Sequence, residues 1–117
     1  MSLDDFIKKL ASTPKQVSFA ETIQVINDYF DYKPAAFVNG DLANAAGENE
    51  GSCKIFAFAE LHKLDKETTL QCFGDYYRKD VLDAPDGDGH QNIRNFMQYG
   101  WDGISFTSRA LGAKSSN

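Results

Sequence analysis

The chain has 117 residues, 42% of them hydrophobic, and a formal net charge of −5 from 12 basic and 17 acidic residues. This length and apolar content suit one folded domain over residues 1–117, because a disordered chain lacks the apolar surface that offsets the entropy lost on ordering. The acidic balance argues against nucleic acid and against a membrane as partners, since both attract a surplus of lysine and arginine.

Hydrophobic residues at helical spacing predict five helices. The first covers residues 1–12. The second begins at the Ser18–Glu21 capping box and ends before Pro34, because the residue before a proline avoids the helical region. The third is apolar almost all round, so we expect it to be the buried centre of the fold. The last three predicted helices cover about 52–62, 66–82 and 90–99.

Two short segments, 36–38 and 104–106, predict β structure and are expected to pair as at most one small two-stranded element. The segments 41–51 and 84–89 are rich in Gly, Asn and acidic residues and are predicted loops. Residues 112–117 are predicted to fray, as chain ends often do. The expected fold is therefore mainly α, a compact bundle of about five helices.

The segment Gly51-Ser-Cys-Lys54 stands where a long polar connection enters the apolar helix. A helix N-terminus offers free N–H groups and about half a positive charge, which suits an anion or a thiolate. A cysteine there, beside a lysine, could have its pKa lowered from about 8.5. The alternative, which we favour, is that Ser52 is an N-cap and Cys53 a small core residue, as free cysteines usually are.

Cysteine catalysis would need a histidine within hydrogen-bond reach of the thiol. His62 follows Cys53 by nine residues in the same predicted helix, about 13 Å along its axis, which is too far. Only His90 could serve as the base, with Asn92 or an asparagine of the 39–49 loop to orient its ring. The cysteine and histidine intervals do not match structural zinc, and Asp86–Gly89 lacks the glycine and glutamate positions of a calcium loop. We therefore expect no metal and no cofactor, and lean towards a protein that is not an enzyme.

The sharpest functional hypothesis is one polar site where the 39–54 connection packs against the helix that starts at His90. The connection is long for a link between helices, and such loops are often functional. His90 and Arg94 share a helix face and suit a small anionic ligand, a carboxylate or phosphate. The favoured alternative is that Arg94 pairs with an acid of 80–88 and His90 caps its helix. The candidate ligand-binding residues are Asn39, Asp41, Asn44, Asn49, Ser52, Cys53, Lys54, His90, Asn92 and Arg94.

Three separated motifs follow one another along the chain: NGDLANAAGENEGSCKIFAFAELH, LQCFGDYYRKDVL and HQNIRNFMQYGWDGISF. In this order they resemble the HopJ type III effector family of bacteria, and the similarity spans about Thr13 to Ala113. The resemblance implies an effector-like protein that is secreted into host cells and contacts a host protein. It implies no established biochemical activity.

The expected location is the bacterial cytoplasm. Two isolated cysteines, Cys53 and Cys72, fit a reducing compartment, and we expect them to be unpaired. The N-terminal sequence MSLDDFIKKL lacks the long apolar core of a signal peptide or membrane span, and it predicts a helix rather than the unstructured, Ser-rich start typical of type III secretion signals. Three functions therefore stay open: a non-enzymatic binding or interaction domain, which we favour; a small-ligand binder or enzyme; and a cytoplasmic stress or regulatory protein.

Overall fold

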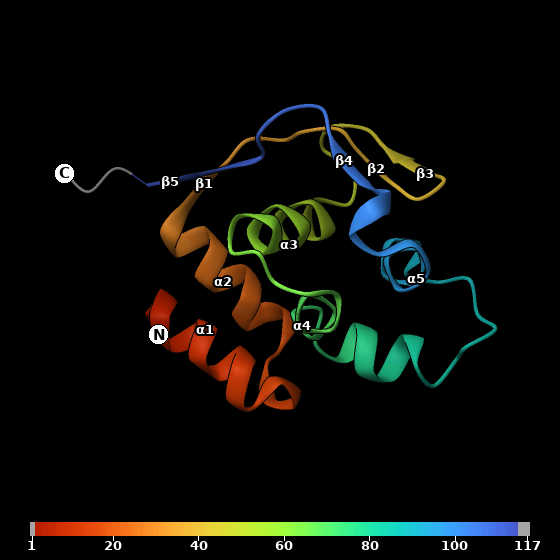
Figure 1. Ribbon diagram of the computed structural model, residues 1–117, viewed down its shortest axis with the longest axis horizontal. Helices are drawn as coiled ribbons and strands as arrows, with labels where there is room; N and C mark the ends of the chain where they lie inside the picture. The colour runs from red at the N-terminus through yellow and green to blue at the C-terminus, as the bar shows by residue number, and fades with distance from the viewer. Residues whose placement is uncertain (1, 115–117) are drawn as a thin grey trace.

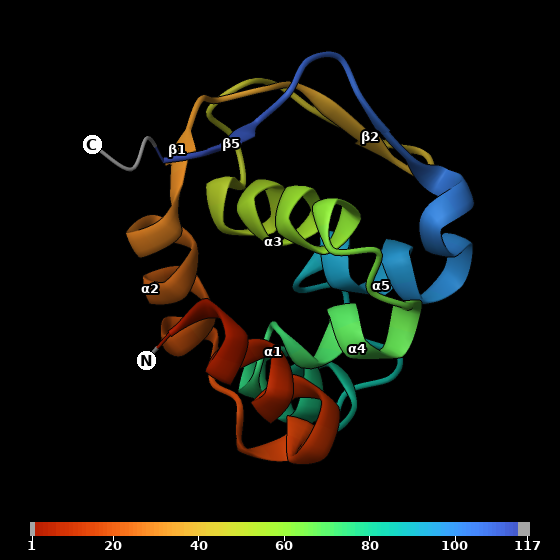
Figure 2. The same cartoon turned by 60° about the vertical axis from the view of Figure 1, so that its left-hand side comes forward.

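Helix α3 (Glu50–Leu61) lies at the centre of the structure, a computed structural model in which residues 2–114 are described (Figure 1). Phe56 and Phe58 of this helix are both fully buried, as the sequence predicted. Because other elements surround α3, it needs no wide polar stripe. The helices around it are α1 (Leu3–Ser12), α2 (Phe19–Tyr29), α4 (Lys66–Gln71) and α5 (Gln91–Tyr99), and the strands cross its remaining side (Figure 2).

The predicted helix over 66–82 is two separate elements, α4 and the π-helical turn η2 (Tyr76–Val81). Gly74 interrupts it with a positive φ of 62°. A Cβ atom at this position would lie 2.6 Å from the backbone nitrogen of Phe19, so glycine is needed for the two backbones to approach this closely. None of the helices within residues 2–114 is long and apolar enough to span a membrane. Two short 3-10 turns are η1 (Pro14–Gln16) and η3 (Gly100–Gly103).

Two small antiparallel sheets make the fold mixed α/β, which corrects the prediction of a mainly α bundle with at most one two-stranded element. The expected pairing does form, since β2 (Phe37–Asn39) lies beside β4 (Ile104–Phe106). A third strand, β3 (Leu42–Asn44), extends this sheet on the other edge of β2. The second sheet joins β1 (Phe30–Tyr32) to β5 (Leu111–Ala113).

All five strands in the described residues have three residues, too few for hydrophobic alternation to show clearly, so the sequence revealed two of them and missed three. Strand β1 follows α2 without a break, so its pattern merges with that of the helix. Strand β5 also shows that the prediction of fraying over residues 112–117 is wrong for its first part. Leu111 is 1% exposed, and the backbone N–H of Lys114 donates to the carbonyl of Tyr29 at 3.2 Å. Residues 115–117 lie outside the described residues.

Three helices, α1, α2 and α4, start with a side chain that caps their first turn. Each cap satisfies an N–H group that a helix start leaves without an intrahelical partner. Only half of the predicted capping box forms at Ser18, because the carboxylate of Glu21 pairs with Lys9 at 2.8 Å instead. The capping side chains and the residues whose N–H groups they accept are Ser2 with Asp5 at 3.1 Å, Ser18 with Glu21 at 3.1 Å, and Asp65 with Thr68 at 2.8 Å.

Candidate ligand-binding site

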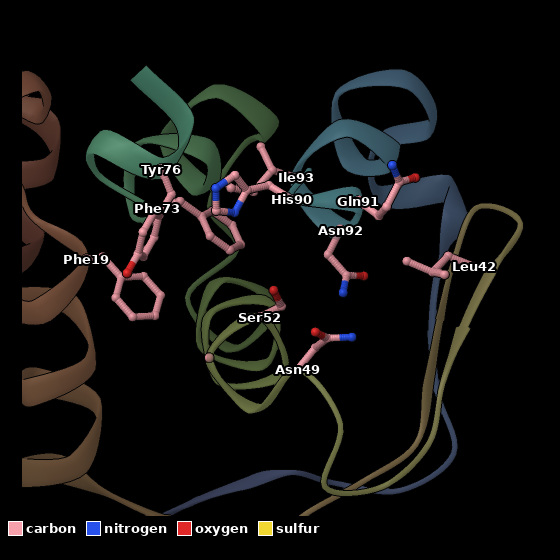
Figure 3. Close-up of a pocket in the computed structure, with 11 residues that line it drawn as sticks. Phe19, Leu42, Asn49, Ser52, Phe73, Tyr76, His90, Gln91, Asn92 and Ile93 are labelled. Carbon is pink, nitrogen blue, oxygen red and sulfur yellow. The ribbon is translucent and has the colours of Figure 1, made fainter. Parts of the chain in front are cut away.

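A cavity of about 520 Å³ lies where the first turns of α3 and α5 meet (Figure 3). Its size falls within the range of small-molecule sites, about 300–1,000 Å³. Polar groups from the two helix starts and aromatic side chains from other segments surround it. The lining residues are Asn49, Gly51 and Ser52 at α3, His90, Gln91, Asn92 and Ile93 at α5, and Phe19, Leu42, Phe73 and Tyr76 elsewhere.

The two helices that meet at the cavity have no side-chain cap. Their N-cap residues, Asn49 and His90, adopt the left-handed conformation with φ of 49° and 56°, and neither side chain accepts a hydrogen bond from its own helix. Helix α3 starts at Glu50, two residues before Ser52, where the sequence predicted its start. The first N–H groups of a helix have no intrahelical acceptor, so two sets of uncapped donors lie beside one cavity.

A network of asparagine side chains joins the hairpin of β2 and β3 to α5. The amide nitrogen Nδ2 of Asn39 donates to the carbonyl oxygen of Asn92 at 2.8 Å and to its Oδ1 at 3.0 Å. The Oδ1 of Asn44 accepts from Nδ2 of Asn92 at 3.0 Å and from Nδ2 of Asn49 at 2.7 Å. Asn39 and Asn44 are buried. All four asparagines were predicted site residues. Asn39 and Asn44 do not line the cavity; their hydrogen bonds form a framework that positions Asn49 and Asn92 beside it.

Asp41, another predicted site residue, also belongs to this framework rather than to the cavity. Its Oδ1 accepts a hydrogen bond from Nδ2 of Asn95 at 2.9 Å. The same Asn95 nitrogen donates to the carbonyl oxygen of Asn39 at 2.8 Å. The second turn of α5 thus holds the turn of the hairpin, while its first turn faces the cavity.

Cys53 does not face the cavity. Its side chain is 1% exposed, and its Sγ lies 3.7 Å from the carbonyl oxygen of Ala35, to which it donates. Burial raises the pKa of this thiol, although it stands in the first turns of α3. Burial also raises the pKa of Cys72 to about 12. The structure therefore favours the core-residue interpretation of Cys53 over the reactive thiolate.

Lys54 and Arg94, the two predicted cationic ligands, bind other parts of the chain. The Nζ of Lys54 donates to Oδ1 of Asn27 at 3.1 Å and lies 4.8 Å from the centre of the Tyr32 ring. The guanidinium of Arg94 donates to the carbonyl oxygens of Ala84, at 2.8 Å, and of Gly89. Arg94 thus binds loop carbonyls. It does not line the cavity between α3 and α5, and it pairs with no acid among the described residues.

His90 lies at the cavity without Arg94. Its Nε2 is 3.3 Å from Oδ2 of Asp80, and its ring centre is 5.1 Å from that of Tyr76, with 34° between the planes. Ser52 lines the same cavity. Of the ten predicted site residues, the structure gathers Asn49, Ser52, His90 and Asn92 around one space; that they bind a ligand stays a prediction.

Aromatic side chains, Phe19, Phe73 and Tyr76, form another part of the cavity lining. Phe19 and Tyr76 make an edge contact with ring centres 5.0 Å apart, and Tyr76 is 42% exposed. A Cβ atom at Gly51 would lie 2.7 Å from Cζ of Phe19, so the start of α3 also packs against this ring. These residues come from segments far apart in the chain, and no local pattern predicts that they meet.

Comparison with known proteins places the chain in a family. The family model described as HopJ type III effector protein matches residues 3–111. The chain belongs to this family. A solved structure, described as the crystal structure of the unknown function protein VPA0580, is 56% identical to the chain, with a TM-score of 0.96 over 97% of this chain and 95% of the other. None of the curated proteins compared with the chain matches it significantly. The HopJ resemblance found in the sequence is confirmed, and no biochemical activity comes with it.

Proposed function

We propose that this HopJ-family protein is a non-enzymatic binding domain whose ligand is a small anionic molecule held in the cavity between α3 and α5. One observation supports the proposal above the others: the uncapped starts of two helices meet at a single cavity. Helix starts attract anions through their free N–H groups and a partial charge of about +0.5 each. Two such ends beside one space act on the same ligand.

The polar side chains at the cavity add donors to those of the backbone. The amides of Asn49, Gln91 and Asn92 and the hydroxyl of Ser52 all line it. Each of the three amide nitrogens already donates one hydrogen bond within the chain, so only its second N–H is left for a ligand. Among the described residues, no lysine or arginine lines the cavity. The anion is therefore expected to be recognised through neutral N–H and O–H donors, which leaves binding dependent on the two helix starts.

Binding is favoured over catalysis by the arrangement of the nucleophile candidates. Cys53 is in the core, where burial raises its pKa. Ser52 and His90 line the same cavity, but no hydrogen bond joins them in the described structure. Nucleophilic catalysis needs a base that can take the proton of the hydroxyl or thiol, so these observations support a binding protein.

The proposal is tested by titrating the ¹⁵N-labelled protein with inorganic phosphate at constant ionic strength. We expect saturable shifts of the amide signals of Gly51, Ser52, Gln91 and Asn92. The amides of Asp5 and Glu21, whose helix starts are capped, serve as internal controls and should not move. Shifts that spread over the whole surface without saturation would contradict the proposal.

A substitution that adds a charge gives the matched test. Ser52→Asp places a carboxylate in the first turn of α3, where it suits the helix dipole but repels a second anion. The fold should therefore persist, while phosphate binding is lost. Thr68→Asp puts the same charge at the equivalent position of α4, away from the cavity, and should leave binding unchanged. Equal binding by both variants would contradict the proposed site.

Membership of the HopJ family favours a second candidate function, contact with a protein of a host cell after secretion. A reporter fused to the chain would measure this in a bacterium with a type III secretion system. Transfer into host cells that is lost in a secretion-defective strain supports the second candidate. Retention of the reporter in both strains would support the bacterial cytoplasm, the location that the sequence predicts.

A further inference from the structure

The cavity has two walls of different chemistry. Phe19, Phe73 and Tyr76 lie on one side, and Asn49 and Asn92 lie on the other (Figure 3). The polar side holds the amides described above. The uncapped helix starts touch both sides, since Gly51 of α3 packs against Phe19 and His90 at the start of α5 packs against Tyr76. The aromatic side offers ring faces and edges that prefer an apolar or aromatic neighbour to water. A ligand that satisfies both walls must itself have two chemically different parts.

The aromatic wall is held in place by contacts with the backbone. A Cβ atom at Gly51 would lie 2.7 Å from Cζ of Phe19, and one at Gly74 would lie 2.6 Å from the Phe19 nitrogen. Two glycines from different elements thus let α3 and the α4–η2 junction close around Phe19. Tyr76 packs between this ring and His90, with ring centres 5.0 and 5.1 Å away. The wall is therefore formed before any ligand arrives, which lowers the entropy cost of binding.

The cavity is also larger than a simple anion requires. Its volume of about 520 Å³ would hold more than ten water molecules at roughly 30 Å³ each. An inorganic anion at the helix starts would leave the aromatic wall in contact with water. A neutral aromatic molecule would leave the N–H groups of α3 and α5 without an acceptor.

We infer that the ligand carries a flat aromatic group next to its anionic group, an inference that rests on the anion-binding function proposed above. The ring packs against Tyr76 and Phe19. The carboxylate or phosphate attached to it accepts hydrogen bonds at the starts of α3 and α5. Ligands with only one of these parts satisfy one wall and bind more weakly.

The test compares the affinities of four probes by the same amide-shift titration: phenyl phosphate, methyl phosphate, inorganic phosphate and phenol. We expect phenyl phosphate to bind about tenfold more tightly than methyl phosphate, the scale of an aromatic contact together with ring burial. Equal affinities for phenyl and methyl phosphate would overturn the inference about the ring while leaving anion binding intact. No saturable binding of any phosphate, or phenol binding as tightly as phenyl phosphate, would overturn both proposals.

A variant separates the two walls. Tyr76→Ala should remove the preference for phenyl over methyl phosphate and leave the affinity for methyl phosphate unchanged. Tyr76→Leu keeps an apolar side chain and serves as the second variant if the first does not fold. The matched control is Tyr29→Ala, because Tyr29 is similarly exposed, at 37%, and does not line the cavity. If both Tyr76 variants fold and still bind phenyl phosphate about tenfold more tightly than methyl phosphate, the ring of the ligand does not pack against the aromatic wall and the inference is overturned.

Discussion

The starts of α3 and α5 differ from those of α1, α2 and α4 in how their first N–H groups are satisfied. Ser or Asp caps the latter three, and such a cap is worth about 1 kcal/mol. At α3 the N-cap residue is Asn49, a residue type that usually caps, yet its side chain donates to Asn44. A good capping residue does not therefore guarantee a cap, because a tertiary partner can orient the side chain away from the helix. The uncapped donors then remain beside the cavity.

The largest expected effect concerns what stabilises α3 when no cap does. Phe58 is fully buried and contacts Phe6 and Phe30 edge-on, with ring centres 6.0 and 5.8 Å away. Phe58→Ala should therefore lower the free energy of unfolding by about 3–5 kcal/mol, the usual cost of truncating a buried phenylalanine. Urea denaturation measures this change. Leu61→Ala, at a position 48% exposed on the same helix, is the control and should cost much less. Similar losses in the two variants would show that burial is not what holds α3.

The second prediction concerns the asparagine network that draws Asn49 away from capping. Asn92→Ala removes the oxygen that accepts from both Asn39 and Asn44 and the N–H group that donates to Asn44, and both of these partners are buried. A buried polar group left without a partner costs about 1–3 kcal/mol, so we expect a loss of that size in urea denaturation. Gln98→Ala, at an exposed position of the same helix, is the matched control. Unchanged stability of Asn92→Ala would mean that the network does not hold the hairpin against α5.

Several features of the site could be predicted from the sequence because they depend on local pattern. The length and composition of the 39–54 connection, together with the helix that starts near His90, led to Asn49, Ser52 and Asn92 as candidates. The pairing of residues near 37 with those near 105 was predicted as well. These features follow from turn chemistry and helical spacing over a few residues.

The features that the sequence did not reveal depend on contacts between distant segments. Phe19 follows the helical pattern of its own segment and Tyr76 lies in another, and only tertiary packing brings the two rings together at the cavity wall. Gly74 gives no local sign that it must pass close to the backbone of Phe19. Arg94 was expected to bind an anion or an acid, but loop carbonyls occupy it. Side-chain orientation at such positions is decided by tertiary partners, so a single sequence cannot fix it.

The third prediction concerns Cys53, which stands near the uncapped start of α3. A helix N-terminus lowers the pKa of a thiol, but burial is the larger effect here and raises it. The folded protein therefore holds a proton that the unfolded chain releases above the ordinary thiol pKa. The contribution of Cys53 to the free energy of unfolding is therefore fully present below the ordinary thiol pKa. It falls as the pH rises above that pKa, by at most about 1.4 kcal/mol per pH unit.

Thiol reactivity gives the direct measurement for Cys53. In the native protein at pH 8, a thiol-specific reagent should modify it far more slowly than in the urea-unfolded chain. A Cys72→Ala variant isolates the signal of Cys53. Rapid reaction of the folded variant would show that the helix start, rather than burial, controls this thiol. Cys53 would then belong with the cavity donors and not with the core.

The smallest expected effect tests the comparison of capped and uncapped starts directly. Ser18→Ala removes the cap of α2 and should cost about 1 kcal/mol. His90→Gly removes no cap, because His90 accepts no hydrogen bond from α5. Glycine adopts the observed φ of 56° more readily than histidine. This gain opposes the loss of two contacts, the exposed one with Asp80, worth about 0–1 kcal/mol, and the ring contact with Tyr76. The midpoint of urea denaturation should therefore fall less for His90→Gly than for Ser18→Ala. If both variants lost equal stability, the His90 side chain would be supporting the start of α5 by other contacts, and the contrast between the two groups of helices would hold only for α3.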